Sequence, residues 1–262
     1  MAQISTFLII TWAWSWGLWW PYVVYLRSGS LPFGLGPFFE TAHQWAAWGP
    51  FVAALATAIL FHGVGGLKSL LMRGVQVKFA AKYYLLIFLL FPLLIGGAYA
   101  LALFLGQEIA LGEAWNAPQI LPIAFLFIFF LGGPLQEEFG WRGTMLPILL
   151  EKIGLTLSSL CIGLVWGIWH LPLFFMPAQS FYYERPIWGL VLSTTLISFM
   201  FTWLYKRTNG SIWAMLLLHT MFNFTHYMFP TLENDVAATL LWPLQFLVVA
   251  YIIWDWHQER EN

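Results

Sequence analysis

The chain has 262 residues, of which 60% are hydrophobic and 9% charged, and its formal net charge is −1. Soluble globular domains carry about a quarter charged residues, so this composition excludes that class and indicates a polytopic membrane protein. Nucleic acid is excluded as a partner, because the 11 Lys and Arg residues are spread along the chain and form no clustered basic face. The single cysteine, Cys161, excludes an intrachain disulfide and a cysteine-based metal cluster.

Apolar segments recur along the whole chain, and a helix needs about 20 residues to cross the hydrocarbon core of a membrane. Eight candidate segments cover residues 4–26, 45–61, 83–105, 119–150, 155–176, 187–205, 211–229 and 236–256. The sequence therefore predicts an all-α fold, a polytopic membrane helix bundle with about eight transmembrane helices. Because no internal repeat or linker divides the chain, we expect a single transmembrane domain over residues 1–262.

The fourth segment, 119–150, is too long for a simple crossing, and Gly132, Gly133 and Pro134 interrupt it. A proline cannot donate a backbone hydrogen bond, and backbone groups freed within a membrane must find partners inside the protein. We therefore expect a broken helix whose freed backbone groups are bound by neighbouring polar side chains.

Basic residues concentrate in alternate loops and so predict the orientation of the chain. One set of loops carries Lys68, Arg73, Lys78, Lys82, Lys152, Lys206 and Arg207, whereas the opposite loops carry Arg27 and Arg185. By the positive-inside rule, both termini are expected to be cytoplasmic. The basic run 68–82 is interleaved with apolar residues, which fits either a segment that binds anionic membrane lipid or an ordinary solvated loop.

Three charged residues, Glu137, Glu138 and Arg142, lie within the segment 119–150. An ionised side chain near the middle of a membrane costs about 3 kcal/mol or more, so such residues usually have a function. Glu138 and Arg142 are four residues apart and share a helical face, so a structural ion pair would account for both. No basic residue lies at this spacing from Glu137, which favours a functional role for its carboxylate.

Two later segments also carry polar pairs at helical spacing. Trp166 and His170 lie four residues apart, as do His219 and Asn223, so each pair shares one face of its helix. A lone histidine within a membrane often serves only as a hydrogen-bond donor between helices. Two histidines together with an acidic residue are better explained by a shared functional site.

The depth of these residues in the membrane follows from their distance to basic anchors. Glu137 lies 15 residues before Lys152, His170 lies 18 residues after Lys152, and His219 lies 12 residues after Arg207. At a rise of 1.5 Å per residue, all three lie roughly 18–27 Å from the cytoplasmic anchors. We therefore expect one polar site on the helices near 119–150, 155–176 and 211–229.

A carboxylate and two neutral imidazoles can hold and deprotonate a water molecule. They would do so through Zn²⁺ or another divalent metal bound by Glu137, His170 and His219, or without metal, with the carboxylate as the direct general base. Asn223 and His219 would donate hydrogen bonds to the oxyanion formed from a peptide carbonyl. A covalent route and a zincin site are disfavoured, because the sequence has no G-x-S-x-G, no H-E-x-x-H and no Cys beside a His.

The three motifs EEFGWR (137–142), WGIWH (166–170) and HTMFN (219–223) together resemble those of a known family. This is the CAAX protease and bacteriocin-processing (CPBP) family, in its group of type II CAAX prenyl endopeptidases. That family carries E-E-x-x-x-R, an aromatic residue followed by x-x-x-H, and H-x-x-x-N/D on three separate helices. One departure is Trp166, where the family usually has Phe. We expect this change to alter the shape of the pocket without removing a catalytic group.

The resemblance implies an intramembrane endopeptidase, a hydrolase that the family's classification treats as a metalloprotease. Glu137 would activate the water, and His170 would hold that water or a metal. His219 and Asn223 would stabilise the oxyanion. The resemblance leaves open whether a metal is required.

The resemblance also implies a supporting role and a class of substrate. Glu138 with Arg142 would support the site. The substrate would be a hydrophobic or lipidated peptide or protein associated with the membrane, and the short chain favours a prokaryotic plasma membrane. The alternative is a non-catalytic membrane partner, such as a bacteriocin immunity factor or a regulator of a sensor kinase. A proton-coupled transporter is disfavoured, because no inverted repeat is seen.

Overall fold

The computed structural model describes residues 1–179 and 181–261, and all regular structure in this part of the chain is helical. The predicted all-α fold is therefore confirmed, and the expected number of about eight helices agrees roughly with the structure. Among the residues that the structure describes, five helical stretches are long and apolar enough to cross a membrane. The chain forms two compact units, one of Met1–Met72 with Gln136–Ser198 and the other of Arg73–Leu135 with Phe199–Asn262. The expected single domain over residues 1–262 stays a prediction.

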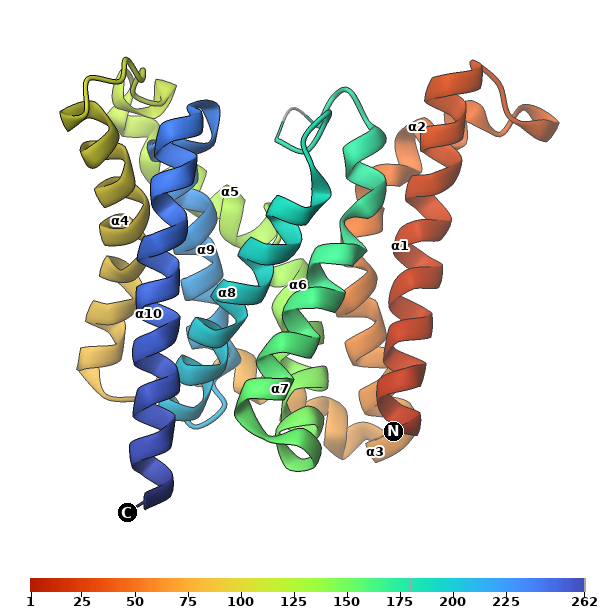
Figure 1. Ribbon diagram of the computed structural model, residues 1–262. Helices are drawn as coiled ribbons and strands as arrows, with labels where there is room; N and C mark the ends of the chain where they lie inside the picture. The colour runs from red at the N-terminus through yellow and green to blue at the C-terminus, as the bar shows by residue number, and fades with distance from the viewer. Residues whose placement is uncertain (180, 262) are drawn as a thin grey trace. The chain divides into compact units, whose positions relative to one another are not determined.

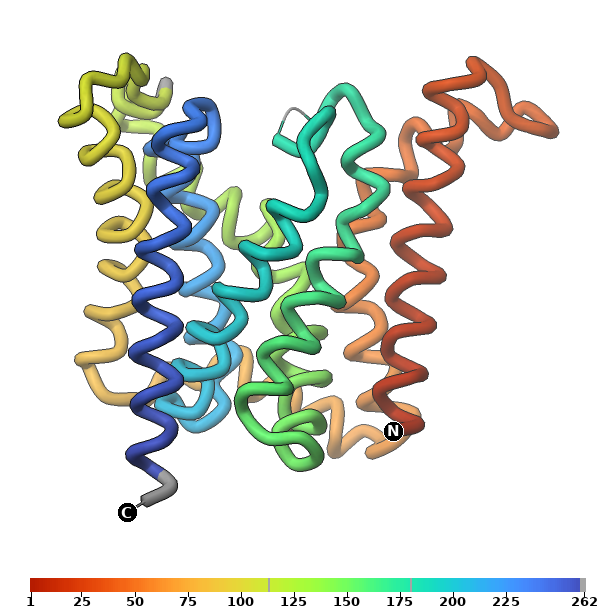
Figure 2. Tube along the Cα trace, in the orientation of Figure 1, coloured from red at the N-terminus to blue at the C-terminus, as the bar shows by residue number. Residues whose placement is uncertain are grey.

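The first unit contains the N-terminal helices and the segment that carries the first two motifs (Figures 1 and 2). Its α-helices are α1 (Ala2–Ser28), α2 (Gly36–Ala42), most of α3 (Gly49–Gly74), the end of α6 (Pro134–Gly140), α7 (Leu146–Trp169) and the start of α8 (Ile187–Arg207). Its shorter elements are the 3₁₀ turns η1 (Pro32–Gly34), η2 (His43–Trp48) and η6 (Leu171–Phe175) and the π-helical turn η5 (Trp141–Met145).

The second unit carries the third motif. Its α-helices are α4 (Ala81–Phe104), α5 (Leu121–Leu131), the start of α6, the end of α8, α9 (Ile212–Met228) and α10 (Asp235–Glu261). Its 3₁₀ turns are η3 (Glu113–Trp115), η4 (Pro118–Ile120) and η7 (Thr231–Glu233). Helix α4 packs against both α9 and α10, and α5 packs against α9 (Figure 1).

The segment 119–150 is broken as expected. Helix α5 ends at Leu131, Gly133 adopts a φ of 114°, and α6 begins with Pro134. Proline suits the first position of a helix, where its missing N–H would have no helical partner. Beside the break, the Asn223 side-chain amide donates a hydrogen bond of 2.8 Å to the backbone carbonyl of Gly132. The expectation that a polar side chain binds the backbone at this interruption is therefore confirmed.

Helix α7 consists of two parts that meet at Gly154. This residue has φ 70° and ψ −174°, a backbone conformation that glycine adopts without strain from a side chain. The chain reverses direction at this point (Figure 2, green). The turn predicted near Lys152, between the fourth and fifth segments, is therefore confirmed.

The second part of α7 packs closely on the start of α8 through Gly163 and Gly167. Thr194 donates a hydrogen bond of 2.9 Å from Oγ1 to the carbonyl of Gly163. A side chain at Gly167 would place its Cβ 2.8 Å from the Cα of Val191. Two small residues four apart allow such close approach of membrane helices. This contact fixes the part of α7 that carries Trp166, which lies between the two glycines.

Candidate active site

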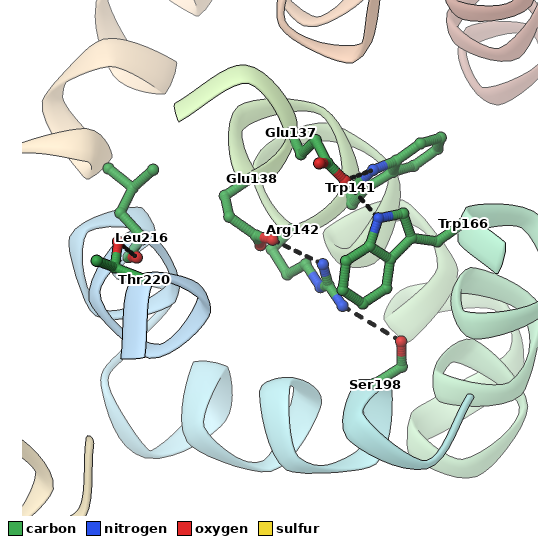
Figure 3. Close-up of polar contacts among 8 residues, drawn as sticks. All are labelled: Glu137, Glu138, Trp141, Arg142, Trp166, Ser198, Leu216 and Thr220. Carbon is green, nitrogen blue, oxygen red and sulfur yellow. Dashed lines mark hydrogen bonds and ion pairs between the residues drawn. The ribbon is translucent and has the colours of Figure 1, made fainter. Parts of the chain in front are cut away.

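Glu137 lies in α6 and is 5% exposed. Its Oε2 atom accepts a hydrogen bond of 3.4 Å from Nε1 of Trp141, one turn along the chain. The same oxygen accepts a hydrogen bond from Nε1 of Trp166 in α7 (Figure 3). Two N–H donors from different helical elements therefore orient the carboxylate.

Glu138 and Arg142 form the ion pair that their spacing predicts, with 2.8 Å between Arg142 Nη1 and Glu138 Oε1. Both side chains are buried, so the pair needs further contacts to offset the cost of removing two charges from water. Arg142 Nη2 donates to Ser198 Oγ at 3.2 Å, and the guanidinium lies 4.4 Å from the centre of the Trp166 ring (Figure 3). Arg142 thereby connects its own turn to both α7 and α8.

The motif residues Trp141 and Arg142 lie on the π-helical turn η5. Within this turn, Thr144 donates a hydrogen bond of 3.0 Å to the carbonyl of Phe139, five residues earlier. Such turns in α-helices occur frequently at functional sites. Nothing in the spacing of the motif predicts this turn, because helical periodicity assumes regular α-geometry.

His170 follows the last residue of α7 and is 6% exposed. Its Nδ1 atom lies 2.8 Å from the carbonyl oxygen of Trp166. Because a carbonyl can only accept, Nδ1 carries a proton, and the lone pair of the neutral ring is on Nε2. This tautomer can accept a hydrogen bond from water or bind a metal through Nε2. Trp166 thus donates a hydrogen bond to Glu137 through its indole N–H and accepts one from His170 through its backbone carbonyl.

Tyr182 is a further aromatic residue beside this site, and the sequence did not identify it. Its ring stacks on the His170 ring, with 5.7 Å between centres and 26° between planes. Burial raises the pKa of the Tyr182 phenol above its usual value, and the negative charge of Glu137 raises this pKa further. Tyr182 is one of three consecutive aromatic residues, 181–183, and only the fold distinguishes it from the other two.

The third motif lies on α9 in the second unit. His219 is 3% exposed, and the Phe201 ring meets its ring edge to face, with 6.0 Å between centres. Asn223 is the residue that binds the Gly132 carbonyl. The expectation that His219 and Asn223 share a site with Glu137 and His170 stays a prediction.

The chemistry of the donor atoms suits a divalent metal. The first unit offers the Glu137 carboxylate and the Nε2 lone pair of His170, both common ligands of Zn²⁺. Among the described residues, no group of three or more His, Cys, Asp and Glu side chains is arranged to hold a metal ion. His219 as a third ligand, and the need for a metal at all, stay predictions.

Comparison with known proteins shows which family this part of the chain is similar to. Residues 119–225 match the family described as Rce1-like, type II CAAX prenyl endopeptidase Rce1-like, and this range contains all three motifs. The predicted resemblance to this family is confirmed. Taken with the apolar helices, the match indicates a multi-pass integral membrane protein.

A curated protein with a related name also matches this chain in sequence. A protein named CAAX prenyl protease 2 from Methanococcus maripaludis is 28% identical to this chain over 178 residues. The matched part is 64% of this chain and 63% of that relative. The chain therefore spans less than two thirds of the length of the relative that it matches.

Proposed function

We propose that the chain is an intramembrane endopeptidase of the CAAX type that hydrolyses a peptide bond in a lipidated or hydrophobic, membrane-associated peptide or protein. The observation that carries this proposal is the position of Trp166. Its indole N–H donates to Glu137, and its backbone carbonyl accepts from His170. A single residue therefore orients a buried carboxylate and a histidine of the tautomer that can bind water. The family match supports the same reaction.

In the proposed mechanism, Glu137 is the general base. A water molecule transfers a proton to the carboxylate while its oxygen bonds to the carbon of the scissile carbonyl, whose π electrons move onto the carbonyl oxygen. His170 accepts a hydrogen bond from the water through Nε2 and so orients its attack. When the tetrahedral intermediate collapses, the C–N bond breaks, and Glu137 returns the proton to the leaving nitrogen. The products are a carboxylic acid and an amine, and transfer of the acid proton to the amine gives a carboxylate and an ammonium group.

The oxyanion of the intermediate needs hydrogen-bond donors, and we assign this role to His219 and Asn223. Removing one such donor typically lowers kcat about 10²–10³-fold. A divalent metal held by Glu137, His170 and His219 would polarise the carbonyl and acidify the bound water. In that version Nε2 of His170 would bind the metal and would not accept a hydrogen bond from the water, and the Trp166 contacts would orient the two residues in either case.

The substrate class and the membrane location extend the same proposal. The family and the archaeal relative are both named for CAAX prenyl proteolysis, so a peptide with a prenylated cysteine near its C-terminus is the first substrate to test. Both termini are proposed to be cytoplasmic, in a prokaryotic plasma membrane, where lipidated substrates would reach the site from the adjoining leaflet.

The test uses the purified full chain in lipid vesicles, a farnesylated peptide ending in a C-a-a-X sequence, and mass spectrometry of the products. We expect Glu137→Gln to lower kcat about 10²–10⁴-fold, as loss of a general base does. The matched control is Glu151→Gln, which changes an exposed carboxylate of α7 in the same way and should keep full activity. Equal cleavage by Glu137→Gln and the unmodified protein would refute Glu137 as the general base, and the absence of cleavage by the unmodified protein would favour a non-catalytic partner protein.

A further inference from the structure

The His170 imidazole needs more than one contact to hold its orientation. The hydrogen bond from Nδ1 to the Trp166 carbonyl fixes one atom of the ring, but the ring can still rotate about that bond. The edge-to-face contact with Trp169, at 4.7 Å and 77°, restricts one side. Tyr182 provides the nearly parallel contact, with its ring plane 26° from that of His170.

The segment between η6 and α8 holds Tyr182 in this position. The Tyr182 backbone N–H donates to the carbonyl of Gln179 at 2.8 Å, and the Tyr182 carbonyl accepts from the Arg185 N–H at 3.1 Å. The rings of Phe174 and Phe181 contact the Tyr182 ring edge to face, at 5.5 and 5.1 Å. Local backbone turns and two aromatic neighbours therefore orient the tyrosine independently of His170.

Tyr182 packs on His170, one residue of the proposed water site, although it belongs to none of the three motifs.

We propose that Tyr182 is a positioning residue: its ring packs on the imidazole of His170 and keeps Nε2 directed at the reacting water. The inference rests on the proposed peptidase function. The aromatic ring of Tyr182 orients the imidazole, and the hydroxyl group is not needed for this role. Loss of the ring would let the imidazole rotate about its Nδ1 hydrogen bond, so that a correctly protonated His170 would spend less time in the productive orientation.

Kinetics with three variants test the inference. We expect Tyr182→Leu to lower kcat about 10–100-fold, the usual effect of removing a residue that orients a catalytic or metal-binding group, and to leave KM within about twofold because the proposed role is to orient His170 and not to bind substrate. Tyr182→Phe keeps the ring and should stay within about threefold of the unmodified protein. The control Tyr183→Leu changes the next tyrosine, for which the described residues show no side-chain hydrogen bond or ring contact with the site.

Nuclear magnetic resonance of the histidine-labelled full chain provides a readout that does not depend on activity. The stacked Tyr182 ring should contribute an upfield shift to the His170 ring protons in the unmodified protein and in Tyr182→Phe, and this contribution should be lost in Tyr182→Leu, while that of the nearby Trp166 and Trp169 rings remains. Loss of a signal in His170→Ala assigns the resonance. An identical His170 spectrum in all three forms would overturn the inference, even if Tyr182→Leu folds poorly and loses activity for that reason.

The two proposals fail in different ways. If the unmodified protein cleaves the farnesylated peptide and Glu137→Gln does not, while Tyr182→Leu retains full kcat, the peptidase proposal stands and the role of Tyr182 is refuted. If the unmodified protein cleaves nothing, the peptidase proposal fails, and the spectra still decide whether Tyr182 orients His170.

Discussion

Trp166 contributes more to the site than its place in the motif suggests. The sequence predicts that Trp in place of the usual Phe changes only the shape of the pocket. In the structure, its indole N–H donates to Glu137, and its ring lies over the Arg142 guanidinium. A phenylalanine would keep a ring near Arg142 but has no N–H for the carboxylate. The chain therefore orients its proposed base with a donor that the usual motif residue lacks.

The substitution Trp166→Phe tests this contribution. We expect kcat/KM to fall about 10–100-fold, because a hydrogen bond to a charged group contributes about 1.5–3 kcal/mol and each 1.4 kcal/mol corresponds to a tenfold change in rate. The matched control is Trp188→Phe, an exposed tryptophan of α8 in the same unit. Unchanged kinetics in Trp166→Phe would show that the Trp141 donor alone suffices to orient Glu137.

At the scale of secondary structure elements, the contact between α7 and α8 holds the second motif, WGIWH (166–170), in position. Gly163 and Gly167 flank Trp166, and both contact the α8 backbone near Thr194. Ser198, one turn further along α8, accepts the hydrogen bond from Arg142. The same pair of helices therefore supports the first motif through Arg142 and the second through Trp166.

A larger residue at the glycine contact should disrupt this arrangement. We expect Gly167→Leu to destabilise the protein by about 1–3 kcal/mol or more, as overpacking of a close contact does, since its Cβ alone would lie 2.7 Å from Thr194 Oγ1. Thermal unfolding in detergent provides the measurement. Gly17→Leu in α1 is the control, because no atom other than those of its chain neighbours and its own helix backbone lies within 4 Å of a Cβ at that position. Equal midpoints for the two variants would contradict this account.

Over the whole molecule, features set by local sequence could be predicted, whereas the contacts between helices could not. The pairing of Glu138 with Arg142 and the break at Pro134 follow from one segment of sequence, because helical spacing and the missing proline N–H are local properties. The hydrogen bond from Trp166 to Glu137 and the stacking of Tyr182 on His170 join different elements of the chain and depend on how these pack. Nearly uniform apolar helices carry little information about which face meets which neighbour.

Metal dependence is a property of the purified whole chain and separates the two versions of the mechanism. A metal-bound water predicts about one equivalent of a divalent metal per chain, its loss in His170→Ala, and no activity after chelation. A metal-free mechanism predicts full activity without bound metal and no effect of the chelator. Elemental analysis alongside the peptide assay distinguishes them, and Glu151→Gln again provides the control because its metal content should equal that of the unmodified protein.

The hydrogen bond from Asn223 to the Gly132 carbonyl affects how the last motif should be interpreted. The family pattern accepts Asn or Asp at this position, but an ionised Asp has no N–H and would repel the carbonyl oxygen. A chain with Asp there must keep that acid protonated or bind the broken helix with another donor. Asn223→Asp and Asn223→Ala therefore test the integrity of the broken helix as well as the proposed binding of the oxyanion. The last residue of the third motif is here also a hydrogen-bond donor to the backbone at the helix break.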